Sequence, residues 1–167
     1  MEEEWRPVSE FEGYFVSNLG RVKSMKPYYG TNGRILKPFQ MKSGCFQIRF
    51  WEKNKESSRL LHRVVAHAFI PNSDNKPEVD HKNRDPSDNR AENLRWATRQ
   101  ENEFNKQKYK NNTTGFKGVM RHVCGKYQAT MTFNKTTIYL GLFNTAEEAS
   151  SVYRQECEKL HGDFISQ

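Results

Sequence analysis

A stretch in the middle of the chain decides the fold: DHKNRDPSDNRAENLRWATRQEN, which runs from Asp80 to Asn102. The extended run Glu78–His81 leads into it and is typical of a short strand. Asp85-Pro86 and Asp88-Asn89 are turn dipeptides, so we expect the chain to reverse after the strand. The stretch therefore predicts a strand, a loop and a second strand that returns beside the first.

A helix is predicted directly after the returning strand. Thr98 and Glu101 have the spacing of a capping box, so the helix begins near Arg99. Asn102 then lies in or near its first turn. When this unit folds back on itself, its Asp80-His81 end can face Asn102.

The residue types at these two ends suit hydrolysis of a phosphodiester. A carboxylate from Asp80 and an amide oxygen from Asn102 suit a hard cation such as Mg²⁺ or Mn²⁺, whereas zinc prefers nitrogen and sulfur. Histidine is the side chain that titrates near neutral pH, so His81 can act as a base toward water. The alternative is a solvated turn before an ordinary capped helix, and spacing alone leaves both interpretations open.

Five segments within residues 58–108 carry a family resemblance: Leu61–Pro71, Lys76–His81, Asp88–Arg90, Asn93–Trp96 and Glu101-Asn102. Together they resemble the HNH nuclease module of phage and intron homing endonucleases. The resemblance implies a ββα-metal hairpin in which His81 is the general base and Asp80 and Asn102 bind the metal. It also implies that Asn93 holds the two strands and the histidine in place. Asn105 stands where some relatives carry histidine, so whether Asn102 or Asn105 reaches the metal stays open.

Composition favours several small modules and a polyanionic partner. Of the 167 residues 35% are hydrophobic and 28% charged, which argues against one large core. The net charge of +7 points to nucleic acid, because no apolar run approaches membrane-spanning length. The chain shows no secretory leader, and three widely spaced cysteines fit neither a disulfide framework nor a zinc cluster. We therefore expect a protein of the cytoplasm of a bacterium or a phage-infected host.

Residues 1–56 form the first predicted module, with short aromatic-rich strands. Phe46, Ile48 and Phe50 alternate with polar residues, and Lys53-Asn54-Lys55 would be a hairpin turn. The pattern from Trp5 to Ser24, including FEGY and SNLGRV, is similar to the NUMOD-type module that precedes HNH homing nucleases. The similarity implies DNA contact, which we assign to three basic residues: Arg21, Lys23 and Arg49.

A helix over residues 60–69 is predicted next, because apolar residues recur at helical spacing before Pro71. It opens the nuclease module, residues 57–108. His62 and His67 lie on it, and a lone helical histidine is more often structural than catalytic, so we expect structural roles for both. Residues 109–114, within a longer polar and basic run, form a predicted linker.

Residues 115–167 predict a three-stranded antiparallel sheet covered by one helix. The expected strands are 116–122, 126–133 and 137–142, with Ile138, Leu140 and Leu142 facing the helix and Asn134-Lys135 as a hairpin turn. Thr145 and Glu148 form a second capping box. Polar residues alternate on the open face of the sheet, and a β-ribbon of this kind fits the major groove of DNA.

This last module resembles the APETALA2-type DNA-binding domain through GFKGV at 115–119, GKYQA at 125–129 and YLGLFNTAEEA at 139–149. Met120 and Cys124 depart from that family's pattern, so its recognition sequence is not carried over. The resemblance and the alternation together place these residues toward DNA: Lys117, His122, Lys126, Gln128, Thr130, Thr132, Thr137 and Tyr139.

The sequence thus predicts an α+β protein of three modules: a small β-rich N-terminal module, a central ββα-metal HNH module, and a C-terminal three-stranded sheet with one helix. The expected function is site-specific DNA endonuclease of the homing type, using one Mg²⁺ (or Mn²⁺) and a histidine base. One Asp-His pair per chain predicts a monomer that binds double-stranded DNA and nicks one strand. A non-catalytic DNA-binding regulator is the alternative from another class.

Overall fold

The computed structural model describes residues 2–26, 33–105, 112–133 and 136–161. They divide into two compact units, Met1–Ala97 and Thr98–Gln167, which are described separately. The predicted α+β class is confirmed, with N-terminal β-sheets, a central region with helices, and a C-terminal three-stranded sheet plus helix. The finer division at residues 56, 108 and 114 stays a prediction. In the described parts of the chain, no helix is long and apolar enough to cross a membrane.

The first unit begins with two antiparallel sheets built from short strands. Strands β1 to β4 pair in chain order, as do β5 to β7. Their bounds are β1 Trp5–Pro7, β2 Tyr14–Ser17, β3 Val22–Ser24, β4 Arg34–Leu36, β5 Phe39–Gln40, β6 Phe46–Glu52 and β7 Lys55–Leu60. Lys53 and Asn54 both have positive φ (47° and 61°), the geometry of a tight two-residue hairpin turn, as the sequence predicted.

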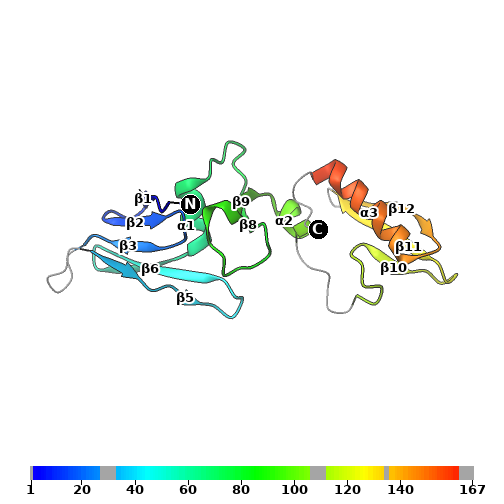
Figure 1. Ribbon diagram of the computed structural model, residues 1–167, viewed down its shortest axis with the longest axis horizontal. Helices are drawn as coiled ribbons and strands as arrows, with labels where there is room; N and C mark the ends of the chain where they lie inside the picture. The colour runs from blue at the N-terminus through cyan, green and yellow to red at the C-terminus, as the bar shows by residue number, and fades with distance from the viewer. Residues whose placement is uncertain (1, 27–32, 106–111, 134–135, 162–167) are drawn as a thin grey trace. The chain divides into compact units, whose positions relative to one another are not determined.

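Helix α1 (Leu61–Phe69) continues directly from β7 and joins the sheets to the candidate site. It packs against both sheets and against the hairpin of β8 (Glu78–His81) and β9 (Leu94–Ala97), as Figure 1 shows. The short 3₁₀ helix η1 (Ala91–Asn93) precedes β9.

One hydrophobic core runs through this unit. It contains Val16 and Phe50 from the sheets, Val65 from α1, and Leu94 and Trp96 from the hairpin. Phe50, Val65 and Val16 are fully shielded from solvent. The β-rich region and the hairpin therefore share one set of buried apolar residues, and this close packing holds the hairpin rigid.

The second unit contains helix α2 (Arg99–Asn105), a three-stranded antiparallel sheet and helix α3 (Ala146–His161). The sheet consists of β10 (Val119–Arg121), β11 (Tyr127–Phe133) and β12 (Thr136–Phe143), paired in that order. Helix α3 covers one face of the sheet (Figure 1). Buried Ala129, Met131, Ala149 and Cys157 lie between the two layers, together with Tyr153.

Both predicted capping boxes form. The Thr98 amide donates to Glu101 Oε2 (2.6 Å) and the Glu101 amide to Thr98 Oγ1 (3.2 Å), so α2 begins at Arg99 as expected. Thr145 and Glu148 make the same pair of bonds at the start of α3. These bonds satisfy amide groups that no helical carbonyl can reach.

Two expectations about the C-terminal sheet are wrong. The strand predicted over 116–122 is shortened to Val119–Arg121, because Gly115 and Gly118 take positive φ (81° and 72°). Leu142 pairs with Gln128 and so lies on the open face, not toward α3. A bulge beside Gly141 shifts the alternation by one residue, and Phe143 packs inward instead. The hairpin turn predicted at 134–135 lies outside the described residues.

Candidate active site

The β8–β9 hairpin places Asp80 and His81 at the end of a strand. The two strands pair antiparallel, with Asp80 opposite Arg95 and His81 opposite Leu94. Asp80 is 5% exposed, and His81 beside it is half-buried. The predicted strand–loop–strand arrangement is therefore present, with its acidic residue inside the protein and its histidine at the edge.

Asp80 forms an ion pair with Arg95. Both Nε and Nη2 of the guanidinium lie 2.8 Å from the same carboxylate oxygen, Oδ2. The Asp80 side chain is 6% exposed and the Arg95 side chain 15%, and a buried carboxylate of this kind requires a partner. No role for Arg95 was predicted from the sequence, because the pairing depends on the hairpin register and the long loop between the strands hides that register.

Asn93 holds the loop between the strands closed. Its Nδ2 donates to Asn83 Oδ1 (2.9 Å) and to the Asp88 carbonyl (2.8 Å), while its Oδ1 accepts from the Asn83 amide (3.0 Å). The Lys82 amide also donates to the Asn93 carbonyl (2.8 Å). One buried amide side chain thus joins both ends of the loop that follows His81.

Two carboxylates stiffen the same loop from within. Asp88 accepts two hydrogen bonds from the Arg90 guanidinium at 2.8 Å each, which lowers the pKa of Asp88. Asp85 accepts from the hydroxyl and amide of Ser87, which lowers the pKa of Asp85. Each carboxylate therefore bonds a residue two positions further along the chain and holds the loop in its turn.

Asn89 fixes the ring of His81. The Nδ2 of Asn89 donates to the Ser87 carbonyl (3.0 Å), so its Oδ1 is the atom that faces His81 Nε2, at 3.3 Å. An amide oxygen only accepts, so Nε2 carries the proton in the neutral ring and Nδ1 holds the lone pair. The sequence analysis placed Asn89 in a turn and in a segment of the family resemblance but gave it no role, although a polar side chain eight positions after the histidine can fold back onto it.

His62 on α1 packs edge-on against the ring of His81, with ring centroids 5.0 Å apart. It is 7% exposed, and its Nδ1 has no hydrogen-bond partner among the described residues. Burial lowers the pKa of His62 to about 4, and the charges of His81 and Arg63 act in the same direction. His67, on the exposed side of α1, instead contacts the ring of Trp96.

The buried His62 makes stability fall in acid. Between pH 6.5 and about 4 the unfolded chain binds a proton at this site and the folded chain does not, so folding is favoured above the window and weakened as pH falls. We expect this group to remove roughly 3 kcal/mol of unfolding free energy between pH 7 and 4.

Urea unfolding followed by tryptophan fluorescence measures this effect, because Trp5, Trp51 and Trp96 all lie in the first unit. His62→Gln should flatten the pH dependence, whereas His67→Gln, an exposed histidine on the same helix, should leave it unchanged. Equal slopes for the wild type and His62→Gln would contradict the assignment.

Helix α2 carries both candidate asparagines of the metal site. Asn102 is partly exposed, whereas Asn105 is 2% exposed. Which of the two shares a metal ion with Asp80 stays a prediction from the sequence. Asn105 is the more deeply buried of the two.

The basic residues predicted to contact DNA in the first unit lie on two sheets. Arg21 and Lys23 both approach the ring of Trp5, with the lysine amino group 4.3 Å from its centroid. Arg21 also forms an ion pair with Glu3. Arg49 lies over the ring of Phe39 on the second sheet and is 3.5 Å from Glu56.

Five residues of the C-terminal unit that were predicted to contact DNA lie on the sheet face opposite α3. The register pairs Thr130 with Tyr139 and Thr132 with Thr137, and Gln128 lies on the same side of β11. Tyr139 is 60% exposed. The side chain of Met120, 52% exposed, joins this face through its pairing with Gln128, a position the sequence noted only as a departure from the family.

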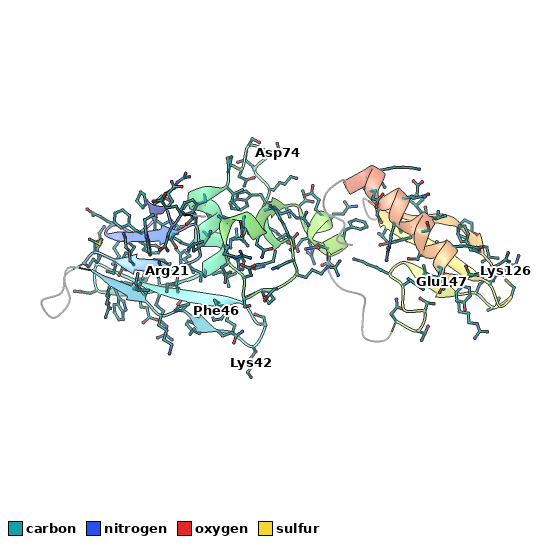
Figure 2. All side chains as sticks on the ribbon, in the orientation of Figure 1. Arg21, Lys42, Phe46, Asp74, Lys126 and Glu147 are labelled. Atoms are coloured by element: carbon teal, nitrogen blue, oxygen red, sulfur yellow. The ribbon has the colours of Figure 1, made fainter. Side chains whose placement is uncertain are left out.

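The three other predicted contacts lie off the strands. His122 and Lys126 flank the β10–β11 turn, where the His122 amide donates to the Lys126 carbonyl (2.8 Å), and Figure 2 shows Lys126 at the end of the sheet. His122 Nδ1 also lies 3.0 Å from Cys124 Sγ. Lys117 differs from both, because its amino group bonds to the end of α2.

Comparison with known proteins places two regions of the chain in described families. Residues 59–104 match the HNH endonuclease family, and residues 3–51 match the NUMOD4 motif. A solved structure, described as DNA binding and cleavage by the HNH homing endonuclease I-HmuI, shares the fold with a TM-score of 0.56. It is 24% identical, and the match covers 94% of this chain and 83% of that chain.

Three relatives are similar in sequence. An uncharacterized HNH endonuclease of Acanthamoeba polyphaga mimivirus is 39% identical over 58% of this chain and 23% of its own length. The DNA endonuclease I-HmuI of Bacillus phage SP01 is 34% identical over 59% of this chain and 55% of its own. Another uncharacterized HNH endonuclease of the mimivirus is 31% identical over 87% of this chain and 67% of its own. Because two thirds of this last relative is matched, the chain belongs to the HNH endonuclease family.

Proposed function

We propose that the protein is a site-specific DNA endonuclease of the homing type, which hydrolyses a phosphodiester bond in double-stranded DNA. The observation that carries the proposal is the hairpin end itself. A buried carboxylate, Asp80, stands beside a histidine whose Nε2 side is occupied by Asn89. A loop locked by Asn93 supports both residues. An ordinary solvated turn would need none of these contacts.

His81 acts as the general base in this proposal. With its Nε2 proton directed to Asn89, its Nδ1 lone pair is the atom that accepts a proton from the attacking water. Asn89 and the edge of His62 keep the ring from turning. Fixing the ring in one orientation lowers the entropic cost of reaching the reactive geometry.

The donor set fits a single hard divalent cation. Among the described residues no group of three or more His, Cys, Asp or Glu gathers in a metal-binding arrangement, so the protein would supply few ligands. Asp80 and Asn102 are the pair that the family resemblance assigns. One or two protein oxygens, completed by water and phosphate, is the usual pattern for Mg²⁺ and also suits Mn²⁺. When bound, the cation supplies Lewis-acid stabilisation of the phosphate.

Asn102 is our choice of second ligand over Asn105. The family resemblance assigns this position to the metal, and Asn102 is partly exposed while Asn105 is 2% exposed. Substituting each asparagine with alanine and comparing the metal concentration needed for half-maximal cleavage distinguishes them.

DNA would be held by the two flanking surfaces. In the first unit these are the Arg21–Lys23 pair at Trp5 and Arg49 at Phe39, where cations and aromatic rings alternate. In the second unit it is the open face of β11 and β12, which includes the exposed Tyr139. This three-stranded sheet backed by one helix supports the proposed APETALA2-type module, whose strands would enter the major groove.

We expect the enzyme to nick one strand as a monomer, because one chain has one Asp80-His81 pair and the two DNA strands run in opposite directions. The experiment has two steps. Candidate phage and bacterial DNA is incubated with the protein and Mg²⁺, and the cut ends are mapped by sequencing. A supercoiled plasmid carrying the mapped site is then followed over time on a gel with limiting enzyme.

Accumulation of open circles, with a monomer by light scattering, is the expected result. Linear DNA that appears without a nicked intermediate, together with a dimer, would contradict the monomeric nicking mechanism. Specific binding without any cleavage in Mg²⁺ or Mn²⁺ would instead indicate a DNA-binding regulator.

A further inference from the structure

The carboxyl-terminal end of α2 is held by the amino group of Lys117. Lys117 Nζ donates to the carbonyls of Glu103 (2.7 Å) and Phe104 (2.9 Å). These carbonyls belong to the last turn of the helix, where no amide of the helix can reach them. A cation at this position satisfies both oxygens and also complements the negative end of the helix dipole.

Phe104 fastens the same helix through apolar contacts. Its ring packs against the buried cluster of Met131, Tyr153 and Cys157, which joins the sheet to α3. The amino group of Lys117 lies 5.7 Å from the centre of the Phe104 ring. Helix α2 is therefore attached to the sheet and α3 of the second unit by a polar contact and an apolar contact, both at Phe104.

The backbone around Lys117 is built for this contact. Gly118 has a positive φ of 72°, and a Cβ placed on it would lie 2.1 Å from the Tyr153 ring. Only glycine allows the ring to cover this turn. Tyr153 thus fixes the turn that carries Lys117 and also belongs to the cluster that receives Phe104. A lysine that serves only as a mobile phosphate contact needs no such support.

We infer that Lys117 is a positioning residue for α2, through which the three-stranded sheet and α3 set the place of Asn102. This inference rests on the proposed function, in which Asn102 on α2 is a metal ligand. It gives the sheet and α3 a part in cleavage as well as in recognition. It also separates Lys117 from Tyr139 and Lys126, whose predicted role is DNA contact.

The test compares single variants of the full chain by two measurements. Hydrogen exchange followed by mass spectrometry reports the amides of α2, and single-turnover cleavage with separate DNA-binding titrations reports rate and affinity. Lys117→Met should raise amide exchange in residues 99–105 and lower the cleavage rate by about tenfold, the usual effect of losing a bond to a charged donor. DNA affinity should change less than twofold, and the rate should need more Mn²⁺ to reach half its maximum.

Matched variants make the result specific. Lys117→Arg can still donate to both carbonyls and should restore the rate. Phe104→Ala should raise amide exchange in α2 in the same way, although it changes no charged residue. Lys159→Met removes an exposed lysine of α3 in the same unit, paired with Glu156, and should change neither measurement. Tyr139→Ala should weaken binding and leave α2 exchange unchanged.

Three outcomes would overturn the inference. If amide exchange in α2 is unchanged in Lys117→Met, Lys117 does not hold the helix. If the variant loses only DNA affinity, Lys117 is a DNA contact. Faster exchange with an unchanged cleavage rate would separate α2 from catalysis. If the wild-type protein cuts no DNA, the proposed function fails, while the exchange measurement still decides whether Lys117 holds α2.

Discussion

Asp80→Ala should leave no measurable cleavage in either Mg²⁺ or Mn²⁺, and chelation by EDTA should stop the wild-type enzyme until either ion is restored. The physical reason is that Asp80 is the only carboxylate in the proposed ligand pair, so its loss leaves a neutral amide oxygen to hold a divalent cation. Asp74→Ala, an exposed carboxylate in the same unit, is the matched control and should cut normally.

The same substitution also removes the carboxylate that pairs with Arg95, and breaking a typical buried pair costs about 3–5 kcal/mol. Loss of activity must therefore be separated from loss of structure. Asp80→Asn keeps the shape and one oxygen acceptor, and tryptophan fluorescence with DNA-binding titrations shows whether the unit is folded. If a folded Asp80→Asn or Asp80→Ala protein cleaves at more than a few per cent of the wild-type rate, Asp80 is not a metal ligand.

Features set by neighbouring residues could be predicted from the sequence. The capping boxes at Thr98 and Thr145 depend on side chains three positions apart, so both helix starts are encoded locally. The turn at Lys53-Asn54 and the strand before His81 depend on a few consecutive residues. The roles of Asp80, His81 and the asparagines rest on their adjacency and on the family resemblance, and they stay a prediction.

Features set by pairing over a distance could not be predicted. The Asp80–Arg95 pair depends on the register across the loop, and nothing local specifies that register. Leu142 was assigned to the wrong face because one extra residue near Gly141 reverses the alternation beyond it. The DNA-facing role of Lys117 stays a prediction of the APETALA2-type resemblance, and no local pattern indicates its contact with α2.

His81→Ala should lower the single-turnover cleavage rate by roughly 10²–10⁴-fold, the usual contribution of a general base, with DNA affinity nearly unchanged. The remaining rate would come from attack by solvent hydroxide, because Asp80 and Asn102 would still be in place to hold a cation. Asn89→Ala removes only the group that orients the ring, so its effect should be smaller, about tenfold, and should fall on the rate and not on binding.

Chemical rescue makes this prediction specific to proton transfer. In His81→Gly the space of the ring is open, so added imidazole should raise the rate in proportion to its concentration, whereas it should not affect Asp80→Ala. His67→Ala, an exposed histidine on α1, is the control and should cleave at the wild-type rate. If His81→Ala cleaves within threefold of the wild type, another group accepts the proton. A slow variant that imidazole does not restore would indicate that His81 supports the loop and not the chemistry.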